Sequence, residues 1–188
     1  MKTQKDGLWV KEVLVLMARK FFALVLLLLG LLPVNSYAWE RGEIFPNLSL
    51  ENGLDPAYQF KSLDEIESKV VVVQIFNMYC PHCQKDAPVV NKLYAKLRAD
   101  FPASKVTLLG LGIGNTKREV EVFRNSFKIE FPLFWDEQNR FLELFGNLGT
   151  PYFFVLKKTD KGFQVVYMHA GELQDWEKLY VQIKNNFS

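Results

Sequence analysis

The chain has 188 residues and a formal net charge of +2, and its composition is 49% hydrophobic and 14% aromatic. These values are typical of a globular protein with a full core, and they exclude a disordered or fibrous one. No internal repeat or low-complexity stretch follows residue 38, so we expect one compact domain.

Residues 1–38 differ in composition from the rest of the chain and predict a secretory signal peptide. The basic pair 19–20 leads into the apolar stretch 21–34, and a small-x-small cleavage site, Ser-Tyr-Ala, follows at 36–38. The apolar stretch is shorter than the roughly 18 to 20 residues that span a bilayer, and Pro33 interrupts it. We therefore expect this leader to be removed.

Cleavage after Ala38 would leave residues 39–188 in the periplasm or another extracytoplasmic compartment. Translation starts at Met1 or at Met17, which begins a more ordinary signal peptide. The alternative is an uncleaved leader that anchors the protein in a membrane through residues 21–34. Loss of the leader removes five basic and two acidic residues, which leaves 18 basic and 19 acidic ones. This near-neutral balance argues against a nucleic-acid partner.

The first elements after the leader are an extension and a buried strand. Turn formers throughout residues 39–60 predict an irregular extension with one or two short strands. Ser62 is placed to cap a short helix that ends at Glu67. The uninterrupted apolar, β-branched run 70–76 predicts a central strand that is buried on both faces.

A helix and a second strand follow. Apolar residues at helical spacing predict a helix over 81–97, which Pro88 should kink. Residues 105–111 predict another buried strand. Thr116 or Asn115 is then placed to cap a helix that ends at residue 127.

The last third of the chain predicts short elements, a hairpin and a closing helix. A short strand is expected over 131–135 and a short helix over 138–145. Residues 152–156 and 163–167, joined by a glycine-containing turn, predict an antiparallel hairpin. An amphipathic helix over 172–187 ends the chain. The predicted fold class is α/β, with a central mixed sheet flanked by helices.

The motif Cys80-Pro81-His82-Cys83 directly follows the strand predicted over 70–76. Free N–H groups and the dipole at a helix start favour the thiolate of Cys80, the form that attacks disulfides. Pro81 suits the first helical position because it has no N–H. Cys83, nearly one turn on, lies on the same face and can displace a substrate from Cys80. We predict a redox-active pair that works without a cofactor.

His82 adds a hydrogen-bond donor beside Cys80 and, when protonated, a positive charge. Both should lower the pKa of Cys80 and stabilise the reduced pair, which makes the pair a stronger oxidant. A purely structural disulfide is a poor alternative, because residues three apart close too small a loop to constrain the unfolded chain. A zinc site is also disfavoured, since there is no second cysteine pair and His169 is the only other histidine.

Residues 70–88, VVVVQIFNMYCPHCQKDAP, resemble the active-site region of the thioredoxin superfamily, and its TlpA/ResA-like exported branch fits best. Residues 42–50 resemble the opening Gly-x-x-x-Pro-x-x-x-Leu of that branch, residues 131–136 its Pro-and-Asp segment, and residues 149–151 its cis-proline loop. The resemblance implies a thioredoxin-like fold with an N-terminal extension.

The resemblance also implies roles for individual residues. Thr150 and Pro151 would form a cis bond beside the cysteines, where the backbone pairs with substrate. Asp86 stands where the branch has a Glu implicated in thiol chemistry, so we assign it to proton transfer, although an acid there is also a favourable dipole partner. Tyr79 replaces the usual Trp and either packs around the site or contacts substrate. Gln74 replaces thioredoxin's buried Asp and cannot titrate.

The function that the resemblance implies is thiol–disulfide exchange with exported protein thiols or disulfides. The ResA-like branch favours a reductase, for instance of apocytochrome c cysteines, supplied by a membrane electron-donor protein. The Pro-His dipeptide resembles that of DsbA-type enzymes and favours a disulfide-forming oxidase with a membrane electron acceptor. We favour the reductase, because the resemblance to the first branch covers more of the chain.

Two other classes of function are alternatives, a copper-binding module and a peroxidase. Soft ligands at Met78, Cys80, His82 and Cys83 suit Cu(I), and copper-delivering proteins share this fold, but those proteins use a Cys-x-x-x-Cys spacing. A peroxidase of the peroxiredoxin type is disfavoured because Asn77 stands where its Pro-x-x-x-Thr-x-x-Cys signature requires Thr.

Overall fold

The structure, a computed structural model, describes residues 14–22, 24, 39–55, 58, 60–136, 138–146 and 148–187. The chain divides into two units, Met1–Ala38 and Trp39–Ser188. In the first unit residues 14–22 and 24 are helical, and most of the apolar stretch 21–34 lies outside the described residues. No described helix is both long and apolar enough to cross a membrane.

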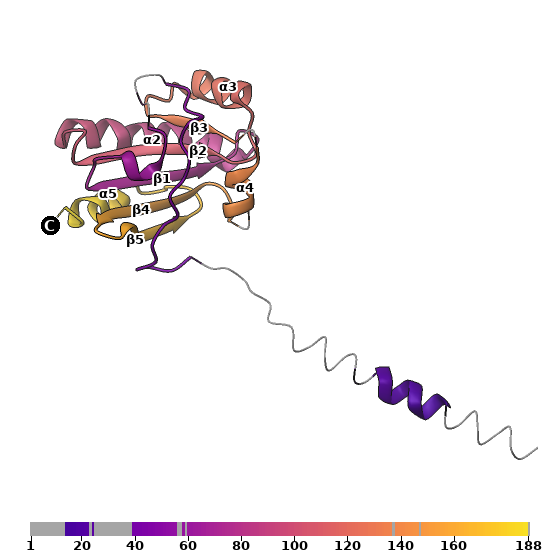
Figure 1. The fold of residues 1–188 in the computed structure, drawn as a ribbon. Coiled ribbons are helices and arrows are strands. Elements are labelled where there is room, and N and C mark those ends of the chain that lie inside the picture. The colour runs from indigo at the N-terminus through magenta and orange to yellow at the C-terminus, as the bar shows by residue number, and fades with distance from the viewer. Residues whose placement is uncertain are drawn as a thin grey trace, which may run out of the picture. The chain divides into compact units, whose positions relative to one another are not determined.

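A five-stranded mixed sheet in the order β3-β2-β1-β4-β5 forms the centre of the second unit (Figure 1). The strands are β1 (Val70–Phe76), β2 (Val106–Gly112), β3 (Leu133–Trp135), β4 (Tyr152–Thr159) and β5 (Gly162–Ala170). The central strand β1 runs parallel to β2 and antiparallel to β4. Every residue of β1 is buried, as its β-branched run predicts. The predicted mixed sheet is confirmed.

Helices cover one face of this sheet, and the extension with one short helix covers the other. On the first face lie α2 (Pro81–Asp100), α3 (Lys117–Phe127) and α5 (Trp176–Asn185). These helices share an apolar core with Val70 and Val72 of β1. On the opposite face α4 (Arg140–Phe145) and the segment 39–66 pack against Val71 and Val73. Successive side chains of β1 point to opposite faces of the sheet, so the core has two parts, one on each face.

The extension runs across the sheet from one edge strand to the other, as the purple segment in Figure 1 shows. Ile44 forms a single bridge with β5, and Gly53 forms one with β3. The prediction of one or two short strands is wrong, because the described residues of 39–60 make only isolated bridges. Because the segment crosses the sheet, its backbone hydrogen bonds to each edge strand are confined to a few residues, 42–45 at β5 and 52–54 at β3.

Several element boundaries also differ from their predictions. A three-residue 3₁₀ helix, η1 (Leu63–Glu65), takes the place of the helix expected to end at Glu67, and the Ser62 side chain makes no capping hydrogen bond. Thr116 does cap α3, through a capping box with Glu119. The closing helix begins at Trp176 instead of residue 172, because the preceding residues form a turn that contacts the cysteine motif.

Candidate active site

The Cys-x-x-Cys motif lies where β1 gives way to α2. Cys80 is the N-cap of the helix and Pro81 its first residue, as the sequence predicts. Both cysteines are free thiols, and their surroundings differ. Cys80 is half-buried, whereas the Cys83 side chain is fully enclosed by the core between β1 and α2. Only the first sulfur is open to a partner molecule.

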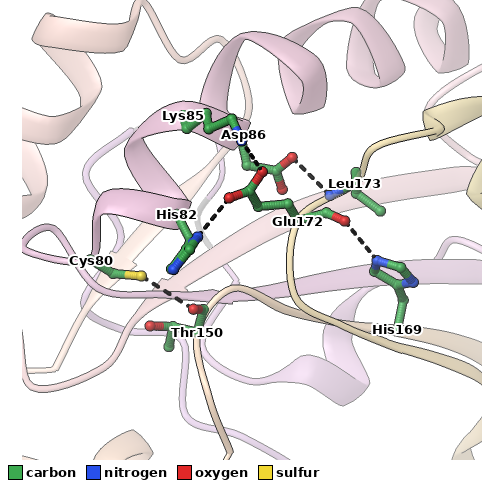
Figure 2. A network of polar contacts seen from close by, with 8 residues as sticks. All are labelled: Cys80, His82, Lys85, Asp86, Thr150, His169, Glu172 and Leu173. Atoms are coloured by element: carbon green, nitrogen blue, oxygen red, sulfur yellow. Dashed lines mark hydrogen bonds and ion pairs between the residues drawn. The ribbon is translucent and has the colours of Figure 1, made fainter.

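Hydrogen bonds decide the ionisation of Cys80. Burial raises the pKa of Cys80, but hydrogen bonds from the Thr150 side chain and from the backbone and thiol of Cys83 outweigh burial. The backbone N–H of His82 contributes further, and the net pKa of Cys80 lies below its ordinary value. In its protonated form the thiol donates to the carbonyl oxygen of Thr150, 3.2 Å away (Figure 2).

The buried cysteine behaves in the opposite way. Burial, with a smaller contribution from the neighbouring Cys80, raises the pKa of Cys83 to about 12, and the hydrogen bond from the backbone of Asn77 offsets only part of this rise. Cys83 is therefore a neutral thiol in the reduced protein at neutral pH. The arrangement separates an exposed, acidic thiol from an enclosed thiol that needs a base before it can attack.

The side chain of His82 contacts an acid that the sequence does not place beside the motif. Its Nδ1 lies 2.6 Å from Oε1 of Glu172, a residue 90 positions further along the chain (Figure 2). The ring is therefore engaged with a carboxylate, and the part of His82 that lowers the pKa of Cys80 is its backbone N–H. Nothing in the sequence places Glu172 beside the motif.

Two asparagine side chains hold the loop before Cys80, a role that sequence reasoning missed. Asn77 donates from its side chain to the Ile113 carbonyl (2.8 Å) and accepts from the Tyr79 N–H (2.9 Å). The Met78 N–H donates to the side chain of the buried Asn115 (2.8 Å). The sequence could not assign this role, because the bond from Asn77 to Ile113 depends on a contact with the end of β2 that the sequence does not specify.

The loop before β4 lies beside the exposed cysteine. The Thr150–Pro151 peptide bond is cis, as the resemblance implies. Thr150 offers its carbonyl and its side chain to the Cys80 sulfur, and Pro151 is buried. The backbone N–H of Gly171 donates to the Pro151 carbonyl (2.8 Å), which joins this loop to the turn after β5.

Asp86 is buried on α2, one turn after Cys83. Burial raises the pKa of Asp86 to about 6, although a hydrogen bond from the Leu173 N–H (2.9 Å) to its Oδ1 opposes that effect. Its Oδ2 is buried and has no hydrogen-bond partner among the described residues. Residues three apart on a helix share a face, so this titratable carboxyl and the enclosed thiol belong to adjacent turns of one face of α2.

Gln74 and Tyr79 occupy different positions around the site. Gln74 is buried on β1, and neither polar atom of its side chain has a partner within the described part of the chain. Tyr79 is 64% exposed and lies outside the core. Its hydroxyl donates to Oε1 of Glu119 (2.5 Å), so the ring stands on the surface beside Cys80. Phe76, by contrast, is buried and stacks on Phe123.

Metal-ligating residues do not gather at the motif. Across the described residues no group of three or more His, Cys, Asp or Glu side chains is arranged to hold a metal ion. His169, the second histidine, donates from Nε2 to the Glu172 carbonyl (3.0 Å). The geometry therefore offers thiol chemistry, with two cysteines of unlike acidity, a carboxyl and a cis-proline loop.

The model of the AhpC/TSA family matches residues 42–163, which include the extension, the cysteine motif and the cis-proline loop. The chain belongs to the AhpC/TSA family. This family is thioredoxin-like, and the fold predicted from the resemblance is confirmed. This AhpC/TSA-family member carries Asn77, not Thr, three residues before its first cysteine.

Curated relatives of this AhpC/TSA-family chain carry the name thiol-disulfide oxidoreductase ResA. The protein from Geobacillus thermodenitrificans is 26% identical over 104 residues, which are 55% of this chain and 58% of the relative. The Bacillus subtilis protein is 24% identical over 126 residues, 67% of this chain and 66% of the relative. This chain thus matches less than two thirds of the length of the first of these relatives.

Solved structures show the same fold. A putative thiol:disulfide interchange protein DsbE from Chlorobium tepidum superposes with a TM-score of 0.64 at 20% identity, covering 80% of this chain and all of the other. The thioredoxin domain of a thiol-disulfide oxidoreductase from Bacteroides vulgatus gives a TM-score of 0.60 at 19% identity, with coverages of 80% and 100%.

Proposed function

We propose that the protein is an exported thiol–disulfide oxidoreductase that exchanges disulfides with protein substrates through Cys80 and Cys83. The observation that carries this proposal is the contrast between the two sulfurs. Cys80 is accessible and its pKa is lowered, whereas Cys83 is enclosed and its pKa is raised to about 12. The names of the curated relatives support the same activity.

The exchange proceeds in two displacements. The Cys80 thiolate attacks one sulfur of a substrate disulfide, the substrate S–S bond breaks, and the leaving sulfur takes up a proton. Cys83 then loses its proton and attacks the Cys80 sulfur, so the mixed disulfide breaks and the second substrate sulfur leaves as a thiol. Two electrons pass to the substrate, and the Cys80–Cys83 disulfide forms without a cofactor. Oxidation of a substrate dithiol is the same sequence reversed.

Asp86 supplies the base for the second displacement. Its carboxyl, with a pKa raised to about 6 by burial, is ionised at neutral pH and has a buried oxygen without a hydrogen-bond partner among the described residues. A base in this position can accept the Cys83 proton and return it when the reaction runs backwards. The enclosed thiol would otherwise ionise too rarely to resolve the mixed disulfide.

The surfaces around Cys80 are suited to a protein substrate. The backbone at Thr150, next to the cis Pro151, faces the reactive sulfur, and Tyr79 is exposed on the other side of the motif. An extended substrate chain could pair with the Thr150 segment while its cysteine meets Cys80. We assign Thr150, Pro151 and Tyr79 to substrate binding.

The direction we favour in the cell is reduction. The ring of His82, the feature that argued for an oxidase, contacts Glu172 through Nδ1, and the negative charge of that carboxylate offsets the charge of a protonated ring. Reduction requires an electron donor outside the cytoplasm, and we propose a membrane protein for this role, with apocytochrome c cysteines as one possible substrate class. The leader 1–38 would deliver the protein to that compartment.

Turnover of a protein disulfide tests the proposed activity. The purified protein should reduce insulin when dithiothreitol regenerates the cysteine pair, and Cys80→Ala should abolish this catalysis. Cys83→Ala should stall after the first displacement and accumulate a mixed disulfide, visible as a mass increase on reaction with a small disulfide. Equal rates for the wild type and Cys80→Ala would overturn the proposal.

A further inference from the structure

Backbone hydrogen bonds join the turn between β5 and α5 to the site on both sides of Glu172. The N–H of Gly171 donates to the carbonyl of Pro151 (2.8 Å), and the N–H of Leu173 donates to Oδ1 of Asp86 (2.9 Å). Gly171 has φ of 85°, in the left-handed region that favours glycine. These backbone contacts fix the position of Glu172, which stands between them.

The Glu172 side chain contacts two basic side chains of helix α2. Its Oε1 lies 2.6 Å from Nδ1 of His82, and its Oε2 lies 2.7 Å from Nζ of Lys85 (Figure 2). The carboxylate is the enclosed member of this cluster, with 18% of its side chain exposed against 69% for His82. His169 adds a hydrogen bond to the Glu172 backbone carbonyl. Glu172 therefore contacts His82 from a backbone position that hydrogen bonds fix.

Two anions can interact with the ring of His82. One is the Glu172 carboxylate, whose pKa is lowered by the hydrogen bond from His82 and by Lys85, so that it is charged throughout the neutral range. The other is the Cys80 thiolate, two residues before His82, which exists only when the pair is reduced. Asp86, the other acid facing this cluster, is buried and bonded to the Leu173 N–H. While Glu172 holds Nδ1, its negative charge offsets the positive charge that a protonated ring would present to the Cys80 thiolate.

We propose that Glu172 is a positioning residue that sets the reduction potential of the Cys80–Cys83 pair by keeping the ring of His82 on its own carboxylate. The inference rests on the proposed thiol–disulfide exchange and adds a control of its equilibrium. Without Glu172 the ring is free to pair with the Cys80 thiolate. That pairing stabilises the reduced protein and not the disulfide, so the pair becomes more oxidising.

The test is the equilibrium constant between the protein and a glutathione redox buffer, measured on the wild type, Glu172→Ala, His82→Ala and the double variant. Glu172→Ala should shift the equilibrium about tenfold towards the reduced protein, which corresponds to about 30 mV. The Cys80 thiolate absorbance should titrate at lower pH in this variant. In the His82→Ala background the same substitution should shift the equilibrium less than about threefold, because no ring is left to release.

Asp175→Ala is the matched control, since Asp175 is a nearby acid that pairs with Lys178 (3.3 Å) instead of His82. It should leave the equilibrium unchanged. An unchanged equilibrium in Glu172→Ala, or an equal shift with and without His82, would overturn the inference while leaving the proposed exchange intact. If Glu172→Ala does not fold, His82→Ala alone still decides, because a shift of tenfold or more in that single variant means that the ring already acts on Cys80. Failure of the wild type to form a reversible disulfide would instead contradict the proposed function.

Discussion

Cys80 and Cys83 lie within one turn of the same helix, yet one sulfur is half-buried beside Thr150 and the other is fully enclosed by the core. Their pKa values move in opposite directions, because hydrogen bonds favour the Cys80 thiolate while burial disfavours that of Cys83. The reactivity of the two thiols should therefore be clearly ordered.

Alkylation of the reduced protein with iodoacetamide should modify Cys80 first. The thiolate is the reactive species, and the pKa of Cys83 is raised to about 12, so at neutral pH Cys83 should react at least about a hundredfold more slowly. Peptide mass spectrometry at short times gives the two rates, with the unfolded protein as the control in which both react alike. Faster labelling of Cys83 would reverse the assignment of nucleophile and resolving thiol.

Asp86→Asn should slow the resolution of the mixed disulfide by about tenfold or more at pH 7, because the substitution removes the base that we assign to Cys83. The wild-type rate should rise with pH around 6, the value to which burial raises the pKa of Asp86, and the variant should lose that rise. Stopped-flow measurement of the second displacement separates it from the first, which should be unaffected. A variant that keeps the same pH profile would exclude proton transfer by Asp86.

The same carboxyl should make stability depend on pH. Below the ordinary pKa of 3.8 the carboxyl of Asp86 is protonated in the folded and the unfolded chain, and its burial is tolerated. As pH rises through about 6 the folded state must ionise a buried group, so stability falls by up to about 3 kcal/mol. Urea denaturation between pH 4 and 7 should show this fall in the wild type and in the control Asp160→Asn, but not in Asp86→Asn. A parallel decline in all three proteins would contradict the assignment.

Mass spectrometry of the protein isolated from its exporting cell should find a mature chain that begins near Trp39. The composition of residues 1–38 predicts removal of the leader by a signal peptidase. Replacing Ala38 with a bulky residue should block that cleavage and leave a larger protein in the membrane fraction. An intact 21–34 segment in the wild type would instead favour the uncleaved anchor.

The sequence predicts the elements of this fold well where neighbouring residues determine them. The apolar run of β1, the proline after Cys80 and the capping box at Thr116 each specify an element from residues close together in the chain. The crossing path of residues 39–60 could not be predicted in this way, because its bridges to β5 and β3 depend on edge strands far away in sequence.

The same distinction separates the site residues that the sequence predicts from those that it does not. Cys80, Cys83 and the cis Pro151 follow from the motif and the resemblance, and the structure brings them together. Glu172 could not be foreseen, since it reaches His82 across 90 positions and was expected to begin a helix. A charge argument made from neighbours in sequence therefore omitted the acid that contacts the ring of His82.

The reduction potential of the Cys80–Cys83 pair tests the account most directly. Equilibration of the full wild-type protein with glutathione buffers, read by the fraction of free thiols, should reveal one reversible two-electron couple. With the ring of His82 held by Glu172, we predict a potential closer to the roughly −270 mV of thioredoxin than to the roughly −120 mV of DsbA. A value near about −120 mV would contradict the reductase, and the absence of any reversible couple would contradict thiol–disulfide exchange itself.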